Sequence, residues 1–396
     1  MIIGEEMQQR ALEVAIALAR AKSETGCEGA SIEVALDAFI SVGAGHAYID
    51  QAGNAVLALV GKEAGPTLLI DGHADSIPLH SAAKWTFDPF GGEVNQGRLY
   101  GLGICDQKAS IAAMAVAAQA LVETGWDPKG TLVLVASASE EQMEGVALRQ
   151  VLEKYKPDFA ITTEPTDAKV FTSQRGRAKI EMKVNGRPCH AGHSALGINA
   201  VSFAAGVVHR LATQFPRKNG SEVPLDLNCI DFLSDPYPSV STIPGGAIVR
   251  FDARFGPTET RQSLLGYIND AVAQESLQWS GEVPEVEVDY YKAEVRTWKG
   301  FEAVVSEFAD AWDTPVTSAI VAGTVKALDR LGFDVTVGGY SFCTNGSIIC
   351  GELGIPTIGF GVGDENGAHR IDENVTLDSL ARGTQGLASI MAEVLS

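Results

Sequence analysis

Apolar runs of strand length alternate with helix-length patterns in the first half of the chain, and this alternation constrains the fold more than any other feature. A long stretch rich in alanine, methionine and leucine, residues 107–123, predicts a buried helix. The strand-length runs are 54–60, 66–70, 130–136, 158–163 and, near the C-terminus, 355–361. Strands that alternate with helices predict an α/β fold, a mainly parallel sheet flanked by helices on both faces.

The middle of the chain has a different pattern, in which strands alternate in polarity. Three such strands and two helices are predicted there: strands at 178–184, 246–254 and 285–291, and helices at 195–214 and 258–274. A block of this kind fits a small inserted α+β domain with a one-sided sheet. We therefore expect a discontinuous first domain, residues 1–178 and 294–396, and an inserted domain at 179–293.

The composition excludes several classes of partner. The 396 residues include 50 acidic and 30 basic side chains, a formal net charge of −20, and such a surface repels nucleic acid. No apolar stretch reaches the roughly 20 residues that a membrane-spanning helix needs, so we expect no membrane partner. Polar residues from Glu5 onward argue against a signal peptide. Six scattered cysteines without a C-x-x-C pair predict a reduced, cytoplasmic protein.

Acidic and imidazole side chains follow the predicted strands where each strand ends. Open α/β sheets bind ligands at this edge. Five separate loops contribute the residues His73 and Asp75, Asp106, Glu140 and Glu141, Glu164, and His369. Each has an ordinary explanation by itself, such as a surface ion pair or a helix N-cap. Their repeated position at strand ends favours a common site.

The chemistry of these side chains indicates metal-assisted hydrolysis. Imidazole and carboxylate groups suit zinc, with cobalt or manganese as alternatives. Two ions share ligands best when one carboxylate bridges them, and a further carboxylate can then deprotonate a metal-held water. Adjacent Glu140 and Glu141 are suited to divide the tasks of base and ligand, if a turn brings their side chains together.

Five motifs occur in a fixed order along the chain. They are Gly72-His73-Ala74-Asp75-Ser76-Ile77-Pro78, Trp85-x-x-Asp88-Pro89-Phe90, Gly97-Arg98-Leu99-Tyr100-Gly101-x-Gly103-x-x-Asp106-x-Lys108, Glu140-Glu141 and Glu164-Pro165-Thr166. In this order they resemble the acetylornithine deacetylase and succinyl-diaminopimelate desuccinylase family of binuclear metallohydrolases, which includes aminoacylases and glutamate-type carboxypeptidases. Residues 341–347 are most similar to a little-characterised branch of peptidases and deacylases.

The resemblance implies a role for each residue of the cluster. It implies that two divalent metal ions, with Asp106 as the bridge, are bound by His73, Asp106, Glu141, Glu164 and His369. Asp75 would orient His73, as a ligating imidazole requires, and Glu140 would be the general base.

The resemblance also implies that the inserted domain is a ferredoxin-like lid through which the chain forms a homodimer. His190 would reach the partner subunit's active site and stabilise the oxyanion; a structural histidine beside Cys189 is the alternative. Arg254 would bind the substrate carboxylate, a task that suits a bidentate guanidinium, with an ordinary sheet-edge salt bridge as the alternative. Asn345 would also lie at the substrate.

The expected activity is hydrolysis of an amide C–N bond in a small N-acyl amino acid or related compound, by a hydroxide that bridges the metals. A dipeptidase or carboxypeptidase, a hydrolytic deaminase, and a non-catalytic binding protein on the same scaffold are the alternatives. Departures from the family pattern touch no expected metal ligand but leave the substrate open: Leu102, Ala109, Ser241 and Thr344-Asn345.

Overall fold

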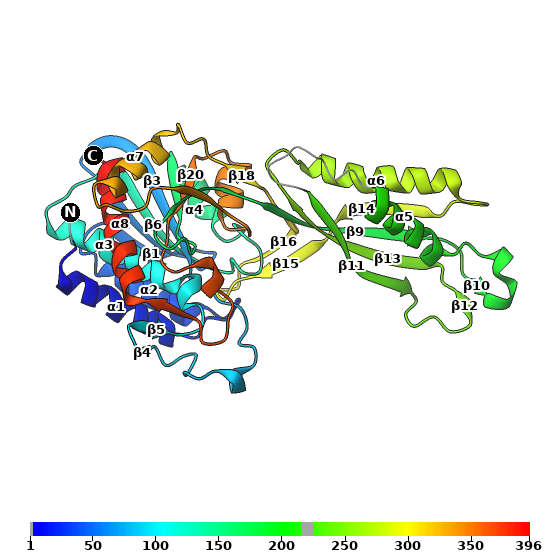
Figure 1. Ribbon diagram of the computed structural model, residues 1–396, viewed down its shortest axis with the longest axis horizontal. Helices are drawn as coiled ribbons and strands as arrows, with labels where there is room; N and C mark the ends of the chain where they lie inside the picture. The colour runs from blue at the N-terminus through cyan, green and yellow to red at the C-terminus, as the bar shows by residue number, and fades with distance from the viewer. Residues whose placement is uncertain (1–2, 215–224) are drawn as a thin grey trace. The chain divides into compact units, whose positions relative to one another are not determined.

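The structure, a computed structural model, describes residues 3–214 and 225–396. The chain forms two compact units (Figure 1). Unit 1 comprises Met1–Gln174, Glu294–Ala303 and Asp313–Ser396. Unit 2 comprises Arg175–Ala293 and Val304–Trp312.

Unit 1 is built on a nine-stranded mixed sheet with the order β1-β2-β6-β3-β7-β20-β8-β18, and β19 pairs with β8. The strands are β1 His46–Ile49, β2 Ala55–Val60, β3 Glu63–His73, β6 Lys129–Ser137, β7 Phe159–Thr162, β8 Val170–Gln174, β18 Trp312–Asp313, β19 Val337–Tyr340 and β20 Thr357–Gly359. The central strands β6, β3, β7 and β20 run parallel, as the alternating pattern predicts. The edge pairs β1–β2 and β2–β6 are antiparallel.

Helices cover both faces of this sheet, which confirms the predicted α/β fold. One face buries its side chains in a common core with α1 Glu5–Arg20, α2 Gly29–Ile40, α3 Ala109–Glu123, α7 Ala319–Asp329 and α8 Leu377–Val394. The other face packs against α4 Arg149–Tyr155 and the short helix η4 Ser347–Glu352. Helix α3 is buried around almost its whole circumference because nearly all its side chains are small and apolar.

The remaining elements of unit 1 are short. A three-stranded sheet consists of β4 Glu93–Asn95, β5 Arg98–Tyr100 and β21 Asn374–Thr376, and one-turn helices are η1 Ala82–Lys84 and η5 Glu365–Gly367. The ribbon of β15 Lys292–Arg296 and β16 Glu302–Ser306 carries the chain into unit 1 and back to unit 2. No described helix is both long and apolar enough to cross a membrane.

Unit 2 is an antiparallel sheet with the order β11-β13-β9-β14, and β17 also pairs with β9. Its elements are β9 Gly176–Asn185, β10 Cys189–His190, η3 Ala191–Leu196, α5 Ala200–Gln214, β11 Asp226–Asp235, β12 Thr242–Ile243, β13 Gly246–Phe255, α6 Arg261–Gln278, β14 Glu285–Tyr290 and β17 Phe308–Ala309. Helices α5 and α6 lie together on one face of the sheet (Figure 1). The predicted strands and helices of this block are all present.

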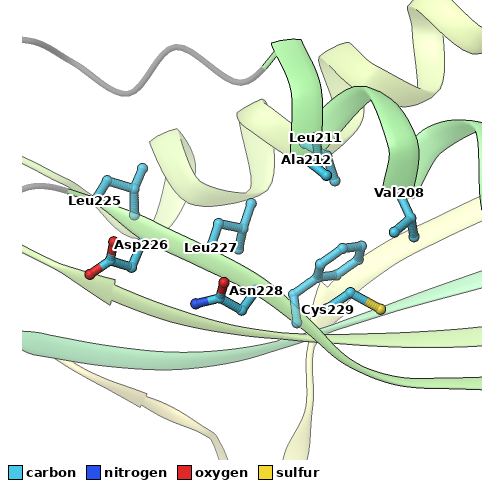
Figure 2. A pocket seen from close by; sticks show the side chains of 9 residues that line it. Val208, Leu211, Ala212, Leu225, Asp226, Leu227, Asn228 and Cys229 are labelled. Atoms are coloured by element: carbon cyan, nitrogen blue, oxygen red, sulfur yellow. The ribbon is translucent and has the colours of Figure 1, made fainter.

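The sequence pattern missed β11, because this edge strand exposes most of its residues and lacks regular alternation. A cavity of about 230 Å³ lies between α5 and β11, lined by apolar side chains of both and of Phe251 and by the polar side chains of Asp226 and Asn228 (Figure 2).

Candidate metal centre

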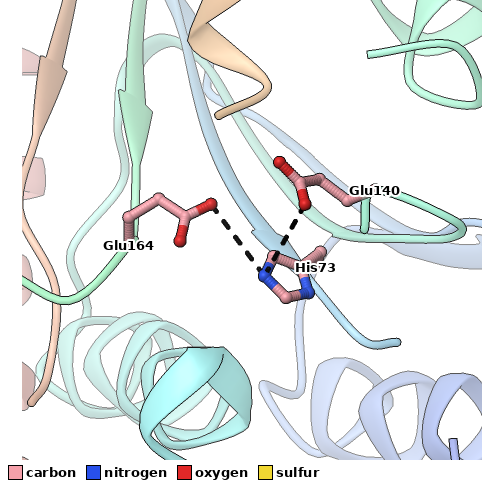
Figure 3. A group of neighbouring side chains, drawn as sticks. All are labelled: His73, Glu140 and Glu164. Carbon is pink, nitrogen blue, oxygen red and sulfur yellow. Dashed lines mark ion pairs between the residues drawn. The ribbon is translucent and has the colours of Figure 1, made fainter. Parts of the chain in front are cut away.

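The site residues of unit 1 come from the ends of adjacent parallel strands. His73 is the last residue of β3, Glu140 follows β6 by three residues and Glu164 follows β7 by two. The registers pair His73 with Ser137 and Asp71 with Thr162, so β3 and β6 end at the same level and β7 ends two residues earlier at the same edge of the sheet. Figure 3 shows the result, in which Glu140 and Glu164 approach His73 from two sides. Nε2 of His73 lies 4.0 Å from Glu140 Oε2 and 3.9 Å from Glu164 Oε1.

Asp106 lies between two imidazoles. It belongs to η2 (Ile104–Lys108), directly before α3. Its Oδ1 atom is 3.0 Å from Nε2 of His73, and its Oδ2 atom is 3.3 Å from Nε2 of His369. Nε2 of His369 is also 3.0 Å from Oε1 of Glu141. The structure therefore brings together two histidines and four carboxylates from five loops.

Burial and charge shape the electrostatics of this cluster. Burial raises the pKa of Glu140 and of Glu164 well above the usual range, and it also raises the pKa of Glu141. Burial acts in the same direction on Asp106, but hydrogen bonds from His369 and His73 outweigh it and lower the pKa of this carboxyl group. Four carboxylates against two imidazoles leave an excess of negative charge in a largely water-free site, which is costly without a cation.

The donor set fits divalent metal ions. Ligand atoms of His73, Glu140 and Glu164 lie within 4.8 Å of one another, and so do those of His73, Asp106 and Glu141. Oε1 of Glu140 is buried and has no hydrogen-bond partner among the described residues. A mixed set of imidazole and carboxylate donors suits zinc and related ions.

Asp75 contacts the cluster in a way that sequence reasoning did not foresee. His73 Nδ1 lies 3.0 Å from the backbone oxygen of Asp75 and 3.6 Å from its Oδ1 atom. The carboxylate of Asp75 also accepts hydrogen bonds from the backbone N–H groups of Glu140 and Glu141, at 3.1 and 3.2 Å, and from the hydroxyl of Thr25 at 2.8 Å. Asp75 thus holds the backbone that carries both glutamates.

Glu373 is a residue of the site that sequence reasoning missed. It is buried, and its carboxylate accepts hydrogen bonds from the backbone N–H groups of Gly103, Cys105 and Asp106, at 2.8 to 3.1 Å. Burial raises the pKa of Glu373 to about 7. Its position four residues after His369 was the available signal, but nothing in the sequence shows that it reaches the loop of Asp106.

Three predicted residues lie outside this cluster. His190 is exposed in unit 2, where its Nδ1 atom accepts a hydrogen bond from Gly192 N–H. Arg254 lies on β13 of the same unit and pairs with Asp252 at 2.9 Å. Asn345 belongs to unit 1 but is only 2% exposed. The substrate and oxyanion roles expected for these three side chains stay predictions.

Comparison with known proteins places the chain among the metal-dependent hydrolases of amide bonds. It belongs to Peptidase family M20/M25/M40, whose model matches residues 69–393. It is 30% identical over 340 residues to the uncharacterized protein YgeY of Escherichia coli, covering 84% of this chain and 81% of that protein. It is 29% identical over 234 residues to the succinyl-diaminopimelate desuccinylase of Rhodospirillum centenum, covering 54% of this chain and 58% of that enzyme.

Solved structures show the same fold. The aminopeptidase PepT from Bacillus cereus superposes with a TM-score of 0.77 at 18% identity, covering 98% of this chain and 99% of that one. The YXEP protein of Bacillus subtilis, a dinuclear metal-binding peptidase, superposes with a TM-score of 0.75 at 13% identity, covering 99% of both chains. The predicted family, fold and metal-dependent amide hydrolysis are therefore confirmed, and small amides or peptides are the substrate class.

Proposed function

We propose that the chain binds two divalent metal ions, zinc foremost with cobalt or manganese as alternatives, and removes the acyl group from a small N-acyl amino acid or related amide. The position of Asp106 carries this proposal. Its two oxygen atoms face two different histidines at 3.0 and 3.3 Å, as a bridging ligand requires.

The donor positions suggest how the ions divide the ligands. His73 and Glu164 would hold one ion and His369 and Glu141 the other, while Asp106 serves both. Bound there, the ions would supply the positive charge that polarises a substrate carbonyl and lowers the pKa of a water molecule.

Glu140 is suited to move the proton. Its buried carboxyl group has a raised pKa, and its Oε1 atom is unpaired among the described residues. Glu140 accepts a proton from water as the water oxygen bonds to the carbonyl carbon. It then delivers this proton to the amine nitrogen as the C–N bond breaks, so that a carboxylic acid and an amine leave the site. His190 donates a hydrogen bond to the oxyanion from the partner subunit.

We further propose a cytoplasmic homodimer that forms through unit 2. The outer strand β11 has no neighbour beyond it among the described residues, and it exposes Ile230, Phe232 and Leu233 by 48%, 37% and 40%. An apolar open edge is a ready site for pairing with a second copy. All six cysteines lie in described parts of the chain and none of them forms a disulfide bond, as a reducing compartment favours.

A panel assay tests the chemistry. The protein is freed of metal with a chelator, reloaded separately with zinc, cobalt or manganese, and assayed for amine release from N-acyl amino acids, dipeptides and related amides. We expect about two equivalents of bound metal per chain and turnover of N-acyl amino acids. Faster cleavage of dipeptides would favour a dipeptidase, whereas no metal uptake and no turnover would indicate a binding protein.

Two variants test the assigned roles. Glu140→Gln should lower kcat by about 100-fold or more while both metals stay bound, whereas Glu153→Gln, an equivalent change at an exposed position of α4, should not. Mixed dimers of Glu140→Gln and His190→Ala chains should regain part of the activity. Absence of recovery would argue against a shared site.

A further inference from the structure

The loop between β6 and α4 carries both Glu140 and Glu141 and contains no regular helix or strand over residues 138–147. A loop of this kind is expected to be mobile unless its backbone groups are held by other parts of the chain. Glu140 nevertheless has to stay at one distance from the histidine and carboxylates around it. Side chains from other parts of the chain hold the two ends of the loop.

Asn345 holds the loop from one side. Its Oδ1 atom accepts a hydrogen bond from the backbone N–H of Gly145 at 2.5 Å. Its Nδ2 atom donates to Oγ of Ser137 at 3.0 Å and to Oδ2 of Asp71 at 2.7 Å. One amide thus connects the end of β6, the far end of the loop, and β3 two residues before His73.

Asn54 holds the same loop from another side. This asparagine is completely buried, directly before β2. Its Oδ1 atom accepts a hydrogen bond from Ala138 N–H at 2.9 Å, and its Nδ2 atom donates to the backbone oxygen of Ala147, also at 2.9 Å. Asp50 fixes this amide in turn, because its Oδ2 atom accepts from Nδ2 of Asn54 at 2.7 Å.

We propose that Asn54 and Asn345 are positioning residues that hold the two ends of the loop 138–147 and thereby set the place of Glu140 relative to His73. Each amide bonds to one residue at the start of the loop and one at its end, and Asp75 holds the middle through the N–H groups of Glu140 and Glu141. The side-chain hydrogen bonds of the two asparagines go to the loop, to Ser137 and to the carboxylates of Asp50 and Asp71, so both would act on Glu140 through the loop.

An amide suits this task because each asparagine must act as both donor and acceptor; Asn54, for example, accepts from Ala138 N–H and donates to the backbone oxygen of Ala147. Asn345 must accept from Gly145 N–H and also donate to Asp71, which only a side chain with both a donor and an acceptor can do. Gly145 has a φ of +76°, and a Cβ atom there would collide with Ile348, so the loop approaches η4 closely at this point. A carboxylate at position 345 would face the carboxylate of Asp71 within a buried site.

Alanine variants test the proposal through exchange and kinetics. Asn54→Ala and Asn345→Ala should speed hydrogen exchange of the backbone amides at 138–147 by about tenfold, the equivalent of one net hydrogen bond. They should lower kcat by about 100-fold, as a displacement of about 1 Å does, with little change in KM. The kinetic part rests on the proposed role of Glu140, and the exchange measurement is independent of that role. Leu387→Ala is the control for general destabilisation, because it creates a cavity in the core beneath α8, away from the loop.

A reciprocal exchange tests the Asn345–Asp71 pair if the alanine variants fail to fold. Asn345→Asp should loosen the loop and lower kcat, because two buried carboxylates then face each other. Adding Asp71→Asn restores an amide–carboxylate pair with the two groups exchanged, and the carboxylate at position 345 still offers an oxygen atom to Gly145 N–H. The double variant should therefore recover both slow exchange of the loop and kcat. The proposal is overturned if exchange at 138–147 is unaffected in the asparagine variants, if kcat stays normal while exchange rises although Glu140→Gln lowers kcat as expected, or if Leu387→Ala reproduces both effects.

Discussion

The Oδ1 atom of Asp75 accepts a hydrogen bond of 3.1 Å from the backbone N–H of Glu140. In Asp75→Asn only one oxygen atom remains to accept a hydrogen bond. The new NH2 group then faces the backbone N–H of Glu140 or Glu141, and two donors cannot bond to each other. We expect kcat to fall by about 100-fold through displacement of Glu140, with metal content unchanged. Steady-state kinetics and metal analysis check this result. Thr25→Ala removes one hydrogen bond to the same carboxylate and should lower kcat by a smaller factor. An unchanged kcat in Asp75→Asn would contradict the positioning role.

Removal of metal should lower the stability of the fold as well as the activity. The buried carboxylates of Glu140 and Glu164 repel each other when no cation lies between them. At a free zinc concentration about 100 times Kd, zinc should add about 3 kcal/mol to the free energy of unfolding. Chemical denaturation of the chelated and the reloaded protein measures this difference. Identical unfolding midpoints would show that the cluster binds no ion.

His369→Ala should remove one metal and leave the fold intact. Its side chain is 47% exposed, so truncation leaves no large cavity, and its Nε2 atom faces only Asp106 and Glu141 among the cluster. Metal content should fall from about two to about one per chain, as expected for loss of a ligand at one of two sites. Elemental analysis after removal of free metal checks the number, with His209→Ala, an exposed histidine of α5, as the matched control.

Glu28 should make stability depend on pH. Burial, together with the charge of Asp75, raises the pKa of this carboxyl group from 4.5 to about 7. The folded protein therefore binds more protons than the unfolded chain between these values, and this group's contribution to stability falls as pH rises from 4.5 to 7. Glu28→Gln should be more stable than the parent at pH 8, by up to about 3 kcal/mol, and equal to it near pH 4.5.

Denaturant unfolding at both pH values tests the Glu28 prediction. Glu33→Gln, an exposed change on α2, should show no pH-dependent difference. If Glu28→Gln were more stable than the parent by the same amount at pH 4.5 and pH 8, Glu28 would be ionised in the folded protein at both pH values or at neither.

Phe232→Lys should disrupt a dimer that forms through β11. A lysine on an open edge strand opposes pairing with a second strand, and the parent side chain is 37% exposed, so the subunit itself should fold normally. Light scattering should report half the parent mass, and activity should fall because the partner's His190 is lost. A monomer with full activity would exclude the shared site, and an unchanged mass would place the interface elsewhere.

Much of the fold could be predicted because its central strands are buried on both faces. Strands β3, β6 and β7 therefore have nearly continuous apolar runs, which differ clearly from the helical pattern of α3. Strands β11, β15 and β16 could not be predicted in the same way. Their residues are mostly exposed or only half-buried, so burial imposes little pattern on them.

The candidate site could be predicted in its residue types and only in part in its contacts. His73, Glu140 and Glu164 were found because parallel strands end at one edge of the sheet. The contacts of Asp75, Asn54 and Asn345 were not foreseen, because each side chain bonds to backbone groups. A backbone N–H is the same in every residue and leaves no signal in the sequence.

By itself, the sequence determined the α/β class, the set of imidazoles and carboxylates, and the family to which the chain belongs. Burial and ligand chemistry both depend on the types of residue and their order, which the sequence contains in full. Only the tertiary structure decided that Asp106 faces His73 and His369 with different oxygen atoms, and that Asp75 holds the backbone of Glu140. These relations join residues far apart in the chain through distances and directions of a few ångströms, which packing of the whole unit sets.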